Sequence, residues 1–307
     1  MKKRSYVGEA DLKLLQDFNA KAIAETDHCG YLHPGDIPHH IYNGNKYYDP
    51  AEVLTIWEDD RGLAAWLLVN VRFKGFDAQV RPDLRGGDLE REMLELAYER
   101  TSELVRQYGI ECEYIHADAF RGDTARIRLL DELGWKLEDE LPYVLNRTKI
   151  SPVSVRDLPE GFSYRSAKGI EDAVALAEVH NAAFTPTNWT PELYRKVMES
   201  PGYDPERELI IQAPDGSFVA FCIIWLDQLN RTGSFEPVGT HRDYQRRGFG
   251  RAIMLYGIQK MAAAGMKYAT VAHFGDNKAA RGLYQSLGFM PWHLQDEYSK
   301  LASQSQS

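Results

Sequence analysis

Phe235-Glu-Pro-Val-Gly-Thr-His-Arg-Asp-Tyr-Gln-Arg-Arg-Gly-Phe-Gly-Arg-Ala252 is the stretch that indicates how this chain folds. Its start continues a strand expected from about Ser234 to Val238, and its end is expected to open a helix. The first turn of a helix has backbone N–H groups without intrahelical partners and a partial positive charge. Gly248 and Gly250 lack a Cβ, so an anion can approach that backbone closely. The stretch therefore predicts a phosphate cradle, with a tight turn between solvated arginines as the alternative.

The surrounding pattern places this loop in an alternation of strands and helices. An apolar strand over residues 218–226 precedes it, and apolar residues recur at helical spacing from Ala252 to Ala262. Gly265 is expected to end that helix, residues 268–274 read as a strand, and a second helix over 277–287 ends before Gly288. This alternation favours an α/β (α+β) fold with a mixed sheet flanked by helices.

The first half of the chain repeats this order. A helix is expected from Asp88 to Gly109, a strand over 110–115, and a helix over 123–133 that closes with Gly134. Equivalent points are offset by 248 − 88 = 160, 265 − 109 = 156 and 288 − 134 = 154 residues. A nearly constant offset is what a domain duplication leaves, with chance similarity of two α/β halves as the alternative.

Composition narrows the class of protein. The chain has 307 residues, 36 Lys and Arg against 45 Asp and Glu, and a net charge of −9. That balance argues against nucleic acid as the main partner, because phosphate binding requires a positive field, and it leaves room for a small cationic substrate. The sequence holds no run of 18 apolar residues, no secretory signal and no disulfide framework among its three cysteines. We therefore expect a cytoplasmic protein without a membrane partner.

Two domains and a linker are expected. The segment from Lys149 to Phe162 carries two prolines and a glycine and keeps neither a helical nor a strand period. We therefore assign residues 1–150 to one domain, 151–161 to a linker, 162–300 to a second domain and 301–307 to a polar tail.

Two motifs resemble those of the GNAT superfamily of N-acetyltransferases. Gln245-Arg-Arg-Gly-Phe-Gly250 resembles the Gln/Arg-x-x-Gly-x-Gly/Ala signature for acetyl-CoA in that superfamily. Asn277-Lys-Ala-Ala-Arg-Gly-Leu-Tyr-Gln-Ser-Leu-Gly-Phe289 is similar to its second motif, Asn-x-x-Ala-x-x-Leu-Tyr-x-x-x-Gly-Phe. The resemblance covers about residues 160–295, and the first half reads as a divergent copy. It implies two tandem GNAT-like domains, each a six- or seven-stranded mixed sheet whose central strands separate to admit the pantetheine arm.

The resemblance also implies how acetyl-CoA would bind as co-substrate, without a metal. The end of the strand would pair with the pantetheine amides, backbone N–H groups of the loop would hold the pyrophosphate, and Asn277 would contact the cofactor. The implied cofactor-binding residues are Val238, Gly239, Thr240, Gln245, Arg246, Arg247, Gly248, Phe249, Gly250, Arg251 and Asn277.

Two residues are the candidates for proton transfer. Tyr284 matches the family's tyrosine that acts as general acid, and a phenol pKa of about 10 lies close to the thiol's pKa of about 8.5. An amine must lose a proton before it attacks a thioester, and Glu236 stands on the strand where many family members carry a base. A tyrosine that only packs beside the cofactor, and a solvated or ion-paired glutamate, are the alternatives. Cys222 is expected to be a core residue rather than a nucleophile.

Two further groups of residues need an interpretation. In the family the region after the first helix borders the acceptor pocket, which here suggests Phe184, Trp189 and Tyr194, each with core packing as the alternative. In the first half, four of the nine histidines fall between His28 and His40. Their spacing matches no zinc motif, so we expect a loop rather than a metal site.

The first half is expected to have lost catalysis. Aligning Asp83 with Asp243 puts Asp88 and Glu90 in place of both loop glycines, where a carboxylate would repel a pyrophosphate. A slip of one residue would instead match Gly87 with Gly248. The two catalytic candidates, Glu236 and Tyr284, fall on Phe76 and Leu130.

These features predict an acetyl-CoA-dependent N-acetyltransferase. The second domain would acetylate a primary amine of a small molecule, or of a peptide or protein, by direct attack in a ternary complex. Transfer of a longer acyl group, and a CoA-binding sensor without turnover, are the alternatives. We expect a small-molecule amine as partner, no nucleic acid, and a monomer or homodimer.

Overall fold

The computed structural model describes residues 1–152 and 154–303, and its chain forms two compact units. The first unit comprises Met1–Val144, Phe274–Asp276 and the described residues from His293 onward, and the second comprises Leu145–His273 and Asn277–Trp292. This division differs from the expected domains at both C-terminal ends. Residues 145–150 belong to the second unit and residues 293–300 to the first. Each unit therefore contains a strand from the other half of the sequence, which no local pattern indicates.

The first unit is built on one mixed sheet. Its elements are β1 (Lys2–Ser5), α1 (Glu9–Thr26), α2 (Pro50–Val53), β2 (Leu54–Asp59), β3 (Gly62–Asn70), β4 (Gly75–Val80), α3 (Asp88–Gln107), β5 (Tyr114–Phe120), α4 (Thr124–Glu132), β6 (Lys136–Leu137) and the later part of β13 (Met290–Leu301). The strand order is β1–β2–β3–β4–β5–β13, with β6 beside β13. Only β4 and β5 are parallel among the pairings recorded for the described residues.

The second unit repeats this plan. Its elements are β7 (Tyr143–Lys149), β8 (Ser163–Ser166), α5 (Ala173–Ala183), α6 (Pro191–Met198), β9 (Glu208–Gln212), β10 (Phe218–Asp227), β11 (Thr232–Thr240), α7 (Phe249–Ala263), β12 (Tyr268–Phe274) and α8 (Lys278–Ser286). The strand order is β7–β12–β11–β10–β9–β8. Strands β11 and β12 are parallel, whereas β8, β9, β10 and β11 pair antiparallel in succession.

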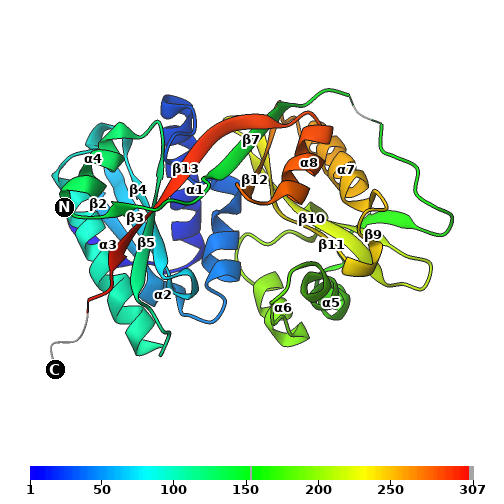
Figure 1. The fold of residues 1–307 in the computed structure, drawn as a ribbon, viewed down its shortest axis with the longest axis horizontal. Coiled ribbons are helices and arrows are strands. Elements are labelled where there is room, and N and C mark those ends of the chain that lie inside the picture. The colour runs from blue at the N-terminus through cyan, green and yellow to red at the C-terminus, as the bar shows by residue number, and fades with distance from the viewer. Residues whose placement is uncertain (153, 304–307) are drawn as a thin grey trace. The chain divides into compact units, whose positions relative to one another are not determined.

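Helices cover both faces of the second sheet, with α5 and α6 on one side and α7 and α8 on the other (Figure 1). Successive side chains of β9 point to opposite faces of the sheet and so contribute to the apolar core on each face. Leu209 and Ile211 pack with residues of α7, whereas Ile210 packs with residues of α5 and α6. The predicted mixed sheet flanked by helices is thereby confirmed. Within the described residues, no helix has both the length and the apolar character needed to cross a membrane.

Equivalent turns recur in the two units. Short 3₁₀ turns, Pro82–Leu84 and Arg242–Tyr244, follow β4 and β11. Asp123 caps α4 by accepting from the backbone N–H of Arg126, and Asn277 caps α8 by accepting from that of Ala280. Such recurrence of small features at matching points supports the predicted duplication.

Two predicted boundaries were wrong. The strand expected over 110–115 begins instead at Tyr114, because Ile110 closes α3: Gly109 has φ +65° and the Ile110 N–H donates to the carbonyl of Val105. The polar tail expected from residue 301 starts later, because Leu301 ends β13 opposite Tyr114. Residues 304–307 of that tail lie outside the described residues.

Candidate active site at the end of strand β11

Strands β11 and β12 pair over only part of their lengths. Their recorded register runs from Thr232 opposite Tyr268 to Phe235 opposite Val271. Strand β11 then continues along β10 alone, as far as Thr240 opposite Ala220. Over Val238–Thr240 the backbone groups on the β12 side are therefore available to an extended ligand chain, as they are when a strand is added to a sheet edge.

Glu236 is the first residue of β11 beyond this paired part. Ile223 of β10 lies opposite both Glu236 and Pro237, which is a β-bulge, a feature that re-aims side chains. Nε1 of Trp225 donates to the backbone oxygen of Glu236 at 2.6 Å and fixes the bulge. The Glu236 side chain is half-buried, and its desolvation raises the pKa of the carboxyl to about 7. A carboxyl with this pKa is suited to accept a proton near neutral pH.

Tyr284 lies on α8 with a buried side chain. Its ring centroid is 5.9 Å from that of His273 and 6.2 Å from that of Phe289. Burial raises the pKa of the phenol, and the negative charge of Glu236 raises it further. Both effects favour the protonated phenol, and we treat Glu236 and Tyr284 as one candidate site.

The loop after β11 enters α7 through Gly248. This glycine caps the helix with φ +89°, a conformation in which other residues are strained. A Cβ on Gly250 would approach Oγ1 of Thr240 to 3.2 Å, so the first turn of α7 sits tightly against the end of β11. Nε2 of Gln245 donates to the Thr240 carbonyl at 3.3 Å and holds the loop there. The result is a bare-backbone cradle at a helix start, which suits a phosphate.

Arginines gather at this cradle without carboxylate partners. The exposed side chains there are those of Arg246, Arg247 and Arg251. Within the described chain none of the three forms an ion pair, and Arg247 lies over the ring of Tyr244 at 5.1 Å. Uncompensated positive charge beside a helix N-terminus favours a polyanionic ligand.

The equivalent loop of the first unit already contains an anion. Gly87 precedes α3 as Gly248 precedes α7, but Gly87 is extended with φ −98° whereas Gly248 has φ +89°, so the caps do not decide between the two alignments. Glu90 is fully buried, and its carboxylate accepts from the N–H of Gly86 at 2.5 Å and from Nε of Arg126 at 2.6 Å. This internal carboxylate fills the position that an anionic ligand would need.

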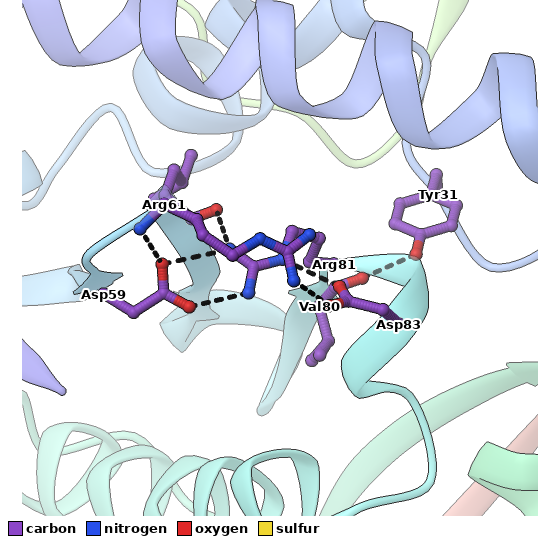
Figure 2. A network of polar contacts seen from close by, with 7 residues as sticks. Tyr31, Asp59, Arg61, Val80, Arg81 and Asp83 are labelled. Atoms are coloured by element: carbon purple, nitrogen blue, oxygen red, sulfur yellow. Dashed lines mark hydrogen bonds and ion pairs between the residues drawn. The ribbon is translucent and has the colours of Figure 1, made fainter.

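The arginines of the first loop are also neutralised. Arg81 binds Asp59 and Asp83, and Arg61 binds Asp83 as well (Figure 2). Tyr31 closes the same region by donating from its hydroxyl to the carbonyl of Val80. The two loops therefore have opposite electrostatic character.

Two predicted cofactor residues have structural roles in the second unit. Oδ1 of Asn277 accepts from the N–H of Ala280 at 3.0 Å, so this oxygen is used for the helix cap. The Phe249 side chain is buried and stacks on Phe162 with centroids 5.2 Å apart. Of Phe249, only the backbone N–H remains for ligand binding.

The structure does not bring the predicted acceptor-pocket residues together as a lining. Trp189 and Tyr194 are 8% and 3% exposed and pack around the ring of His180, so the pocket role is corrected to core packing for both. Phe184 remains half-buried at the end of α5. A Cβ on Gly239 would collide with Phe221 and meet Ala183 at 3.1 Å, so the end of α5 lies against β11 and keeps Phe184 near the site.

Sequence reasoning missed Glu208 on β9. This fully buried carboxyl accepts hydrogen bonds from the hydroxyls of Tyr194 and Tyr203, the latter at 2.7 Å. Burial raises its pKa to about 7, and the two tyrosine hydrogen bonds oppose that rise. The only sequence feature that could have indicated a buried carboxyl is that this acid begins the apolar run Glu-Leu-Ile-Ile.

Cys222 and the histidine-rich loop were the remaining candidates for chemistry. Cys222 is fully buried, burial raises the pKa of its thiol, and it is confirmed as a core residue. His33 accepts from the N–H of Gly35 within its own turn. Over residues 1–152 and 154–303, no three His, Cys, Asp or Glu side chains are arranged to hold a metal ion.

Comparison with known proteins identifies the class. The sequence profile of the acetyltransferase (GNAT) family matches residues 174–289, so the second unit contains a GNAT acetyltransferase domain. The mycothiol acetyltransferase of Kineococcus radiotolerans is 31% identical to this chain over 176 residues, which make up 55% of this chain and 56% of that protein. The chain thus matches little more than half the length of such curated relatives.

Solved structures extend the likeness to the whole chain. A tandem GNAT protein from the clavulanic acid biosynthesis pathway superposes with a TM-score of 0.67 at 13% identity, covering 99% of both chains. An N-acetyltransferase from Sphaerobacter thermophilus superposes with a TM-score of 0.64 at 19% identity, covering 99% of this chain and 96% of that one. The fold is therefore that of a tandem GNAT protein.

Proposed function

We propose that this chain is an acetyl-CoA-dependent N-acetyltransferase that acetylates a primary amine of a small molecule in its second unit. One observation carries the proposal: the recorded pairing of β11 with β12 ends at Phe235, which leaves Glu236 and the edge of Val238–Thr240 beyond it, and the charge of Glu236 acts on the phenol of Tyr284. The match of residues 174–289 to the GNAT family supports the same reaction class.

Residues of the second unit fit acetyl-CoA, which supplies an activated acetyl thioester. The free backbone edge of Val238–Thr240 suits the amides of the pantetheine arm. The glycine cradle at Gly248 and Gly250 suits the pyrophosphate, because a Cβ at either position would strain the backbone or crowd it. Arginines 246, 247 and 251 offset the phosphate charge.

Glu236 is the proposed base. Alkylamines have pKa values of about 10 and carry a proton at neutral pH that must leave before nitrogen can attack. The Glu236 carboxylate accepts this proton, directly or through one water. The nitrogen then forms its bond to the acetyl carbon as the bond from that carbon to sulfur breaks.

Tyr284 is the proposed acid. Its hydroxyl donates a proton to the departing sulfur, and the second proton that the attacking nitrogen loses returns to the phenolate, directly or through water. The products are then an amide, a neutral thiol and the restored phenol. Burial and the nearby Glu236 charge keep the phenol protonated until the sulfur develops negative charge. Glu236 therefore acts on the attacking amine, and Tyr284 acts on the departing sulfur.

The acceptor class is a small-molecule amine. Relatives from Kineococcus radiotolerans and Streptomyces coelicolor bear the name mycothiol acetyltransferase. Phe184, half-buried beside β11, offers apolar contact to the body of such an acceptor. The aminated sugars and amino-acid derivatives accessible to this site form the first test panel.

The test is thiol release from acetyl-CoA in the presence of an amine panel, followed with a thiol reagent. The proposal expects release that depends on both an amine and the wild-type protein. Binding of acetyl-CoA without turnover for any amine would favour a CoA sensor. Faster turnover with long-chain acyl-CoA than with acetyl-CoA would favour the longer-chain transferase.

A further inference from the structure

The segment that joins the two halves is anchored along α7 rather than free. The N–H of Ile150 donates to the carbonyl of Lys267, just beyond the C-terminal end of α7. At the other end of the helix, Phe162 stacks on Phe249 in the first turn. Leu158, between them, packs against the same core. The segment expected to be a linker therefore spans α7 and is held at both ends.

This anchoring places Arg156 at the phosphate cradle. The hydroxyl of Tyr164 donates to the backbone oxygen of Arg156 at 2.8 Å. The guanidinium then lies over the start of α7, so closely that a Cβ on Gly248 would collide with its Nη1. The guanidinium of Arg156 thus lies beside the residue that caps α7.

A cation at this place is unfavourable on its own. The N-terminus of a helix carries about half a positive charge, which repels a guanidinium. Within the part of the chain that the structure describes, Arg156 forms no ion pair and its side chain remains exposed. The same is true of the neighbouring arginines 246, 247 and 251. Positive groups gathered in this way become favourable when an anion lies between them.

The first unit shows this principle with an internal anion. Glu90 is the third residue after the cap of α3, and it meets the N–H of Gly86 and the guanidinium of Arg126. At the same position in α7 stands Arg251, three residues after Gly248. The second unit therefore has the cations of the arrangement but not its carboxylate.

We propose that Arg156 binds the pyrophosphate of acetyl-CoA, so that the segment joining the two halves supplies a side chain to the cofactor site. This inference rests on the proposed function. Arg156 donates to phosphate oxygens beside Gly248 with a charged group, which a backbone cradle alone does not provide. Its role is in binding and not in the proton transfers.

Calorimetry with three ligands tests this assignment. The ligands are acetyl-CoA, acetyl-dephospho-CoA, which lacks the 3′-phosphate, and acetyl-pantetheine, which lacks all phosphates. Arg156→Gln should bind both nucleotides about tenfold more weakly, as expected for loss of about 1.4 kcal/mol, and acetyl-pantetheine as well as wild type does. Arg156→Lys should fall between the two. The control is Arg195→Gln, a half-exposed arginine on α6 that pairs with Glu192, which should change nothing.

Three other results would overturn the assignment of Arg156 to the pyrophosphate. Unchanged or tighter binding of acetyl-CoA by Arg156→Gln, with wild type binding normally, would overturn the inference and leave the proposed function standing. A loss seen for acetyl-CoA but not for acetyl-dephospho-CoA would also overturn it, because the contact would then be to the 3′-phosphate. Failure of the wild-type protein to bind acetyl-CoA at all would overturn both.

Discussion

The carboxyl of Glu236 on β11 acts on the phenol of Tyr284 on α8: its negative charge raises the pKa of Tyr284 beyond what burial does. Desolvation meanwhile raises the pKa of Glu236 to about 7. Neighbouring titratable groups in such different environments suit opposite roles, one that accepts a proton at neutral pH and one that retains it. This pair is the reason to place acyl transfer at the end of β11.

Substituting Glu236→Gln removes the proposed base. The base works when deprotonated, so wild-type kcat/KM should rise about tenfold per pH unit below the pKa of about 7 and level off above it. The variant should lose about a hundredfold in rate at pH 8, within the range of general-base effects, and should lose this limb of the profile. The ratio of wild-type to variant rates isolates the carboxyl, because the acceptor's own ionisation is common to both. A variant that keeps the wild-type rate and pH profile would show that Glu236 is not the base.

Substituting Tyr284→Phe keeps the packing of the ring and removes the acidic proton. We expect kcat to fall by about tenfold to a hundredfold while KM for acetyl-CoA stays nearly unchanged, because the lost interaction exists only as the thiolate departs. Steady-state kinetics measure both constants, and calorimetry checks that acetyl-CoA still binds. An undiminished kcat would assign Tyr284 to packing alone.

Phe184 and Tyr194 should now give opposite results. Tyr194→Phe removes one donor from the buried Glu208 and should lower the free energy of unfolding by about 1–2 kcal/mol, without changing KM for the amine. Phe184→Ala should raise that KM several-fold and cost less stability. Urea unfolding measures the free energy of unfolding of each variant, and steady-state kinetics measure its KM for the amine. A raised KM with unchanged stability for Tyr194→Phe would restore its assignment to the acceptor pocket.

The buried Glu208 predicts a dependence of stability on pH. Its pKa of about 7 in the folded chain lies above the ordinary 4.5, so the folded state holds the proton more tightly than the unfolded state. The free energy of unfolding should therefore fall as pH rises from about 4.5 through about 7, by about 3 kcal/mol in all. Glu208→Gln should remove this contribution.

Comparing wild type with Glu208→Gln separates this effect from that of other buried carboxyls. Glu236 also has a pKa raised to about 7 and adds a fall of the same sign. The difference between wild type and Glu208→Gln, measured by urea unfolding at pH 5, 6, 7 and 8, isolates Glu208. Parallel stability curves for the two proteins would mean that Glu208 titrates normally.

Features encoded by local pattern could be predicted from the sequence. The strand, the glycine loop and the helix around Gly248 follow from residue types at fixed spacing, and the structure places them as expected. Glu236 and Tyr284 could be named because each stands next to such a motif. Their electrostatic coupling depends on tertiary structure and became visible only there.

Features set by tertiary packing could not be predicted. A tryptophan such as Trp189 can line a pocket or pack in a core, and the residue type does not distinguish the two. Its burial against His180 assigns it to the core. Glu90 reads as a surface acid on a helix until its contact with Arg126 is known. The sequence pattern also does not show that the last strand of each half belongs to the other unit. Local residue types predict that a segment is a strand, but not with which strand it pairs.

Calorimetric titration with acetyl-CoA, counting sites in wild type and in Gly248→Glu, tests the central claim most directly. The substitution adds a carboxylate and a strained side chain to the cradle; Gly265→Glu, at φ +83° beyond the other end of α7, is the control for strain alone. We predict one site per chain, abolished by Gly248→Glu and retained by Gly265→Glu. Two sites, or a single site that survives Gly248→Glu in a folded protein, would contradict the assignment of acetyl-CoA to the second unit.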